Sequence, residues 1–195
     1  MKYKNKLIPL NLDEINFIVI HHASSETATP EQIHEWHLKK GWVGAGYNEY
    51  IRKDGSLYIM RGDHEGAHTK GYNQNSYGIC LEGDFEIEKP TEKQLLALIK
   101  TLKYHKSRFK NLRSILKHKD LNDTECPGKN IQMSYIISKV YEQKETWEDI
   151  IKKASDDPNR WIRGIKMIKN MDGNLGDLEI FKYTPDLVLK IKNII

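Results

Sequence analysis

The spacing of apolar residues along the chain predicts a set of short strands. Five segments are rich in β-branched and aromatic residues or alternate apolar with polar positions: residues 16–22, 47–53, 56–61, 77–81 and 113–116. The second and third of these segments flank Asp54-Gly55, a dipeptide typical of a tight hairpin turn. We therefore expect a hairpin at that point, and buried strands at residues 16–22 and 77–81.

A second pattern, with apolar residues three and four positions apart, predicts helices between these strands. The first helix begins at Thr29, which is followed by a proline and, three residues on, by a glutamine, as in a capped helix start. Ile33, Trp36 and His37 fall on one face of this helix, which we expect to be buried. His34 is expected on its surface.

Two further helices complete the main domain. One starts at Thr91, again with a glutamine three residues later, and the other covers about residues 131–143. The apolar stripe of the former consists of Leu95, Leu98, Ile99 and Leu102. Strands that alternate with helices predict an α/β layered domain, here a mixed central β-sheet flanked by helices.

After residue 143 the pattern becomes helical only. Thr146, Asp157-Pro158 and Thr184-Pro185 each precede an apolar stripe with helical spacing. We predict a main α/β domain over residues 1–143 and a small helical module over residues 144–195. The sequence leaves open whether this module docks on the main domain or binds a partner.

Composition and charge are those of an ordinary globular protein. Of the 195 residues, 38% are hydrophobic and 30% charged, and 31 Lys and Arg stand against 27 Asp and Glu. The resulting charge of +4 is no nucleic-acid signature, and no apolar stretch is long enough for membrane insertion or a signal peptide. We expect a protein made in the cytoplasm, whose two cysteines form no disulfide framework.

Three widely separated residues have the chemistry of a zinc site. His21 ends the apolar run of the first strand, and His118 is followed eight residues later by Cys126 and then by Pro-Gly. Zinc binds imidazole nitrogen and thiolate sulfur, and a catalytic zinc keeps a fourth position open for water or substrate. Three such ligands therefore suggest hydrolysis rather than a structural metal.

A competing motif lies at residues 64–68, His-Glu-Gly-Ala-His, which matches the zinc-protease signature. That chemistry needs His64 and His68 one turn apart on a helix, with Glu65 as the base. Glycines surround the motif, and a glycine inside a helix costs about 1 kcal/mol. We interpret the match as accidental, so that a zinc endopeptidase is the third candidate function.

Around these residues, about ten short segments resemble one known family in order and interval, over roughly residues 16–140. They include Val-Ile-His-His-Ala at 19–23, Gly-Trp at 41–42, Gly-Tyr at 46–47, Gly-Ala-His-Thr-Lys-Gly-Tyr-Asn at 66–73, Ser-Tyr-Gly-Ile-Cys-Leu-Glu-Gly-Asp-Phe at 76–85 and the stretch 118–128. The chain resembles the zinc-dependent N-acetylmuramoyl-L-alanine amidases of type 2, which include phage amidase-type lysozymes and animal peptidoglycan recognition proteins. The resemblance implies a mixed sheet with helices on both sides.

The resemblance also implies roles for individual residues. His21, rather than its neighbour His22, is the first ligand of a Zn2+ ion that His118 and Cys126 complete. Tyr47 matches a tyrosine whose hydroxyl assists at the reacting water or oxyanion. Thr124 stands where some phage enzymes have a catalytic lysine, and other active members also have threonine there. Four residues are expected to bind substrate: His68, Tyr72, Asn73 and Trp42.

The expected function is zinc-dependent hydrolysis of the amide bond between N-acetylmuramic acid and L-alanine in bacterial peptidoglycan. The leading setting is a phage or prophage endolysin, which would reach the wall after holin-type release or lysis, and a cytoplasmic recycling amidase is second. A non-catalytic recognition module is the alternative class. No acidic residue occurs between Glu92 and Asp120, where nine Lys and Arg lie. This run is either a solvated face or an attraction to an anionic cell wall.

Overall fold

The computed structural model describes residues 1–142, which are built on a five-stranded sheet. The strand order is β3-β2-β4-β1-β5. The strands are β1 (Phe17–His22), β2 (Glu49–Ile51), β3 (Leu57–Ile59), β4 (Ser76–Leu81) and β5 (Ser114–Lys117). The five predicted strands are thus all present, each within a few residues of its predicted bounds.

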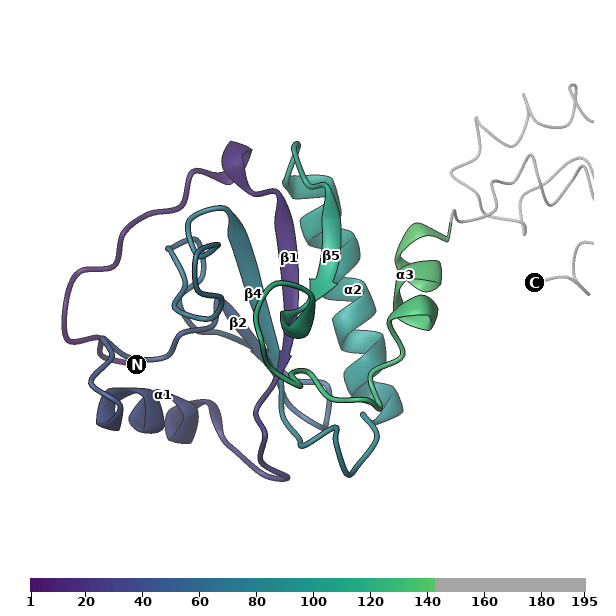
Figure 1. Ribbon diagram of the computed structural model, residues 1–195, viewed down its shortest axis with the longest axis horizontal. Coiled ribbons are helices and arrows are strands. Elements are labelled where there is room, and N and C mark those ends of the chain that lie inside the picture. The colour runs from purple at the N-terminus through teal and green to yellow at the C-terminus, as the bar shows by residue number, and fades with distance from the viewer. Residues whose placement is uncertain (143–195) are drawn as a thin grey trace, which may run out of the picture. The chain divides into compact units, whose positions relative to one another are not determined.

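Four of the strands run parallel, and β3 joins the edge of the sheet as the antiparallel arm of a hairpin with β2. β1 lies between β4 and β5 (Figure 1). Parallel strands end at the same edge of a sheet, and ligands of α/β proteins commonly bind at that edge. Here β1 ends at His22 and β5 delivers His118 to the same edge, where the short helix η2 (His118–Asp120) begins.

Helices cover both faces of the sheet (Figure 1). α2 (Glu92–Arg108) and α3 (Met133–Tyr141) pack with Ile18, Ile20 and Ile79 into the larger core. α1 (Pro30–Lys39) packs its Ile33 with Tyr50 and Cys80 on the other face. The predicted caps are both formed, since Thr29 accepts the Gln32 N–H and Thr91 accepts the Gln94 N–H.

Alternation along β1 decides which side of the sheet each of its side chains faces. Ile18 and Ile20 point into the core under α2 and α3. His21 therefore points to the opposite face, beside Cys80, its partner in the β1–β4 register. Of the two adjacent histidines, His21 thus shares its side with α1, whereas the ring of His22 packs near Phe85 of the larger core.

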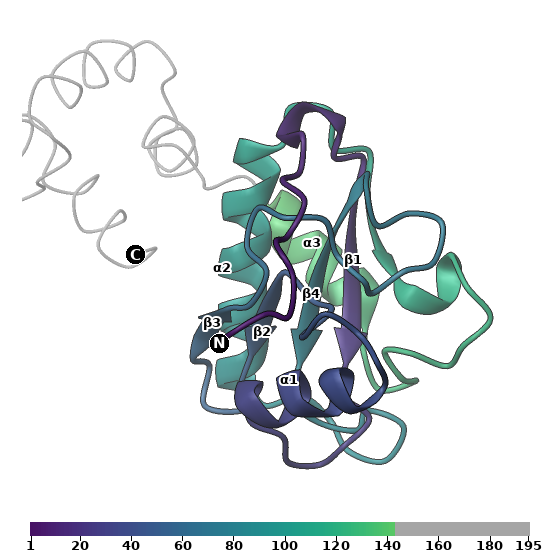
Figure 2. The same ribbon diagram turned by 90° about the vertical axis from the view of Figure 1, so that its left-hand side faces the viewer.

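The prediction for the face of α1 is partly wrong. His34 is buried, at 5% exposure, whereas Trp36 is 38% exposed. Residues 1–16 begin near α1 and run along the sheet to its far end before entering β1 (Figure 2). The start of this arm covers His34, whose Nε2 lies 3.0 Å from the Lys2 carbonyl. Its Nδ1 accepts the Ala45 N–H, so the contacts of a distant segment, invisible to helical periodicity, bury this polar residue.

The predicted fold class, a mixed sheet flanked by helices, is confirmed. The helices predicted within residues 144–195, and the module they would form, lie outside the described residues. Within residues 1–142 no helix combines the length and the apolar character needed to span a bilayer.

Candidate metal centre

His21, His118 and Cys126 meet at the carboxyl end of β1 and β5. Each can offer one ligand atom, and these atoms all lie within 4.8 Å of one another. The His21 and His118 ring centroids are 4.5 Å apart, because β1 and β5 pair in parallel up to Ile20 and Lys117, one residue before each histidine. His21 is buried, while His118 and Cys126 are partly exposed. The cluster is therefore reachable from solvent on one side.

The donor set and its spacing fit zinc. In a tetrahedral site with Zn–S of about 2.3 Å and Zn–N of about 2.0 Å, the sulfur and nitrogen lie about 3.5 Å apart. The Cys126 Sγ lies 3.7 Å from His21 Nδ1. The Nε2 of His118 contacts the Asn122 Oδ1 at 3.1 Å, which leaves Nδ1 as its free nitrogen. Three protein ligands leave one tetrahedral position for water or substrate.

His22 serves the cluster through its backbone and not through its ring. Its N–H donates to the Cys126 Sγ at 3.4 Å, a contact that favours the thiolate. Its Nδ1 accepts the Phe85 N–H, so the other ring nitrogen carries the hydrogen and donates to the Ser24 hydroxyl at 2.8 Å. The ring is thus fully used in holding the loops beyond β1 and β4.

Burial sets the protonation of the cluster in the absence of a metal. It lowers the pKa of His21 well below its ordinary value, and the neighbouring His68 and His118 lower it further. Burial also lowers the pKa of His118, so both rings are neutral and keep a lone pair. Burial raises the pKa of the Cys126 thiol to about 12, although the hydrogen bond from the His22 N–H acts to lower it. Metal binding at Cys126 would therefore release a proton.

An aromatic row leads from the cluster to the surface. The Tyr47 ring lies 5.2 Å from that of His21, His37 lies 5.5 Å from Tyr47, and Trp42 lies 4.5 Å from His37. Burial raises the pKa of the Tyr47 hydroxyl well above its ordinary value, and the thiols of Cys80 and Cys126 raise it further. Tyr47 is therefore a neutral hydrogen-bond donor beside the cluster, and Trp42, 38% exposed, lies at the outer end of the row.

Two residues with predicted roles contact the ligands or their backbone. Thr124 accepts the Cys126 N–H on its hydroxyl at 3.3 Å. His68 is 7% exposed, and its Nδ1 lies 3.1 Å from His21 Nε2, on the side of that ring that faces away from Cys126. Catalysis by Thr124 and substrate binding by His68 stay predictions, because these contacts are with the ligand residues themselves.

Tyr72 and Asn73, also predicted to bind substrate, hold the loop in which they lie. The Asn73 Oδ1 accepts the N–H groups of His68 and Thr69, both at 2.9 Å. The Tyr72 ring packs edge-on against Phe17, at the start of β1 and thus at the opposite end of that strand from His21. The structure does not bring the Tyr72 ring to the cluster, and substrate binding by either residue stays a prediction.

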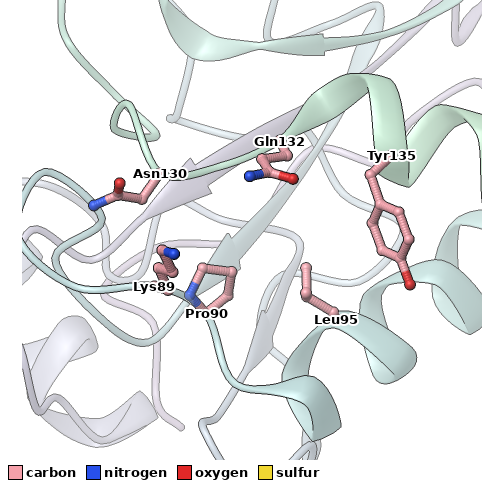
Figure 3. Close-up of a pocket in the computed structure, with 6 residues that line it drawn as sticks. All are labelled: Lys89, Pro90, Leu95, Asn130, Gln132 and Tyr135. Carbon is pink, nitrogen blue, oxygen red and sulfur yellow. The ribbon is translucent and has the colours of Figure 1, made fainter.

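The zinc-protease motif does not form a second metal site in the described part of the chain. Residues 64–68 are not helical, the His64 Nδ1 contacts the Arg61 carbonyl at 2.8 Å, and His68 turns toward His21. A pocket of about 140 Å³ lies elsewhere, between the starts of α2 and α3 (Figure 3). Its lining shares no residue with the cluster: Lys89, Pro90, Leu95, Asn130, Gln132 and Tyr135.

Sequence reasoning missed two residues that support this site. Asn122 contacts His118, and nothing in its surroundings in the sequence marks it except its position between two ligands. His37 was predicted only as a packed helix residue, yet its Nδ1 accepts the N–H of Gly46, the residue before Tyr47, at 2.9 Å. Burial lowers the pKa of His37 to about 4, and nearby Lys40 and Arg61 act in the same direction.

Known proteins share this fold and these segments. The family model for N-acetylmuramoyl-L-alanine amidase matches residues 11–129. Peptidoglycan-recognition protein 2 of Holotrichia diomphalia is 32% identical over 126 residues, 58% of this chain and 67% of that protein. The endolysin of Enterobacteria phage K11 is 33% identical over 107 residues, 52% and 70% of the two chains. The amidase LysC from Clostridium intestinale URNW superposes with a TM-score of 0.67 and 35% identity, covering 73% of this chain and 95% of LysC. This chain belongs to the N-acetylmuramoyl-L-alanine amidase family.

Proposed function

We propose that this protein is a zinc-dependent amidase that hydrolyses the bond between N-acetylmuramic acid and L-alanine in peptidoglycan. The observation that carries the proposal is the cluster of His21, His118 and Cys126, whose ligand atoms lie within 4.8 Å of one another at a partly exposed edge of the sheet. Membership of the amidase family supports the choice of this amide bond as the one that is cut, and of peptidoglycan as the polymer that contains it.

The residues around the cluster suit amide hydrolysis. A bound Zn2+ would act as a Lewis acid and would lower the pKa of a coordinated water toward neutrality. Tyr47 keeps its proton at neutral pH, so its hydroxyl would donate a hydrogen bond to the carbonyl oxygen as that oxygen gains negative charge. His37 would hold Tyr47 in place through the Gly46 N–H, while Trp42 would offer a flat apolar surface to the substrate.

Thr124 has no positive charge to offer at the position where some phage enzymes carry a lysine. Its hydroxyl accepts the Cys126 N–H, and it can still donate its own hydrogen to a substrate oxygen. We therefore assign Thr124 a neutral hydrogen-bonding role, which stabilises an oxyanion less than an ammonium group would.

The proposed setting is a phage or prophage endolysin. It is supported by the K11 relative, which is an endolysin. Under this proposal the protein acts on the cell wall once lysis or a holin-type pore gives access to it.

A recognition module that binds muropeptide without cutting it is the second candidate. The observation that favours it is the relative from Holotrichia diomphalia, a peptidoglycan-recognition protein, at 32% identity. Retention of Cys126 beside both histidines favours the enzyme, because a module that only binds has no need of a third metal ligand.

Mass spectrometry of digested peptidoglycan distinguishes these functions in one experiment. An amidase releases free stem peptides with an L-alanine amino terminus and leaves glycan strands intact, whereas an endopeptidase cuts within the peptides. Cys126→Ser is the control, because it removes the thiolate and keeps the size of the side chain. Products that are unchanged from undigested wall, together with measurable binding to the wall, would establish the recognition module instead.

A further inference from the structure

We propose that His68 and Asn122 are positioning residues, which hold the outward nitrogens of His21 and His118 so that the inward nitrogens face the metal. This inference rests on the proposed function, because it assigns His21 and His118 as ligands. One loop, residues 66–73, would then support both ligand histidines.

The contact with His68 decides which nitrogen of His21 can bind a metal. His21 Nδ1 faces the Cys126 Sγ, and His21 Nε2 lies 3.1 Å from His68 Nδ1. A neutral imidazole carries one N–H and one lone pair. If the hydrogen between the rings belongs to His21 Nε2, then Nδ1 keeps its lone pair for the metal. A lone pair on His68 Nδ1 stabilises that tautomer, as partners of metal-bound histidines generally do. The Thr69 hydroxyl, 2.8 Å from the same His68 nitrogen and 3.5 Å from His21 Nε2, shares this contact.

Asn122 plays the same part for His118 and ties it to the loop of His68. The Oδ1 of Asn122 lies 3.1 Å from His118 Nε2, and its Nδ2 donates to the Lys70 carbonyl at 3.2 Å. Lys70 lies two residues after His68, in the loop that the Asn73 side chain clamps. The outward nitrogens of both histidines are thus held by contacts that lead to a single segment.

The fold makes room for the His68 ring and for little else. A Cβ built on Gly66 would lie 2.2 Å from His68 Cδ2, and one built on Gly78 would lie 2.5 Å from His68 Cγ. No side chain could occupy either position without displacing the ring. Gly66 precedes His68 in the loop and Gly78 lies in β4, so backbone from two segments encloses the imidazole.

The test compares variants of equal shape that differ in one acceptor. Asn carries an oxygen in the place of the His68 Nδ1, and Leu carries a methyl group there. The Zn2+ dissociation constant of the full-length chain, stripped of metal, is measured by competition with a chelator of known affinity. His68→Leu should weaken Zn2+ binding about 10- to 100-fold, and His68→Asn by less than about tenfold. Equal losses in the two variants would show that His68 only fills space and would overturn its role.

Asn122 offers a second pair of variants on a partly exposed loop, where folding is not at risk. Asn122→Asp keeps the acceptor on His118 and should retain Zn2+ affinity, whereas Asn122→Leu should weaken it about tenfold or more. If Asn122→Leu binds as tightly as the wild type, the role of Asn122 is refuted.

His34→Leu is the matched control. His34 is buried at 5% exposure and makes two hydrogen-bonding contacts with backbone, but none with the cluster. This variant should lower the melting temperature and leave Zn2+ affinity unchanged, which separates a positioning role from lost stability. If Cys126→Ser binds Zn2+ as tightly as the wild type, this inference is overturned together with the proposed metal centre. Tight, His68-dependent Zn2+ binding without cleavage of peptidoglycan would overturn the proposed hydrolysis alone.

Discussion

Removing one hydroxyl, in Tyr47→Phe, tests the proposed catalysis most directly. The phenylalanine ring keeps the contacts with His21 and His37, at 5.2 and 5.5 Å between ring centroids. Only a hydrogen-bond donor is lost, and the pKa of this hydroxyl is raised by burial, so the donor is present throughout the neutral pH range.

The magnitude follows from the surroundings of the hydroxyl. A preorganised donor in a site closed to water contributes about 10²- to 10³-fold to kcat. The cluster is partly exposed to solvent at His118 and Cys126, so water also stabilises the developing charge and reduces the share of one donor. We therefore expect kcat to fall about 10- to 100-fold, equivalent to about 1.4–2.7 kcal/mol in the barrier, with KM nearly unchanged, since the interaction strengthens only in the transition state.

Tyr50→Phe is the matched control, three residues away. The buried Tyr50 hydroxyl donates to the Ala28 carbonyl at 2.8 Å, so its loss should cost about 1–3 kcal/mol of stability and leave kcat alone. The assay is release of the stem peptide from a soluble muropeptide, with thermal melts of the same samples. A fully active Tyr47→Phe enzyme, or one that changes KM alone, would refute catalysis by this hydroxyl.

Four further outcomes are expected. Cys126→Ser should reduce bound zinc from about one per chain, measured by elemental analysis, and should abolish turnover; an active, zinc-loaded variant would contradict the ligand assignment. If a positive charge at that position helps catalysis, Thr124→Lys should raise kcat, and an inactive variant would argue against such a benefit. Because the pKa of His37 is lowered to about 4 from 6.5, stability is full above pH 6.5 and should fall between pH 6.5 and 4, where only the unfolded chain gains this proton. Melting temperatures measured against pH should show a smaller fall in His37→Asn, and an identical profile would refute the assignment. Truncation after Gln143 should lower the melting temperature if residues 144–195 dock on the main domain, or reduce wall binding alone if they anchor it; no change in either would show that they do neither.

The secondary structure was predictable because it depends on local patterns. The strand of residues 77–81, the Asp54-Gly55 hairpin and the caps at Thr29 and Thr91 all arise from residues close in sequence. Prediction failed at His34, where the burying segment lies about 30 residues away. Helical periodicity describes the spacing along one helix and contains no information about what covers it.

The sequence by itself determined the family, the α/β class and the three candidate ligands, because imidazole and thiolate at the ends of two strands are unusual chemistry in recognisable surroundings. Only the tertiary structure decided that the parallel pairing of β1 with β5 brings His21 and His118 together, and that His22 points into the other face. It also decided that His68 and Asn122 lie behind the two ligand histidines. Such contacts join segments about 50 residues or more apart, or depend on which way a ring turns, and both are consequences of packing in three dimensions that no local pattern records.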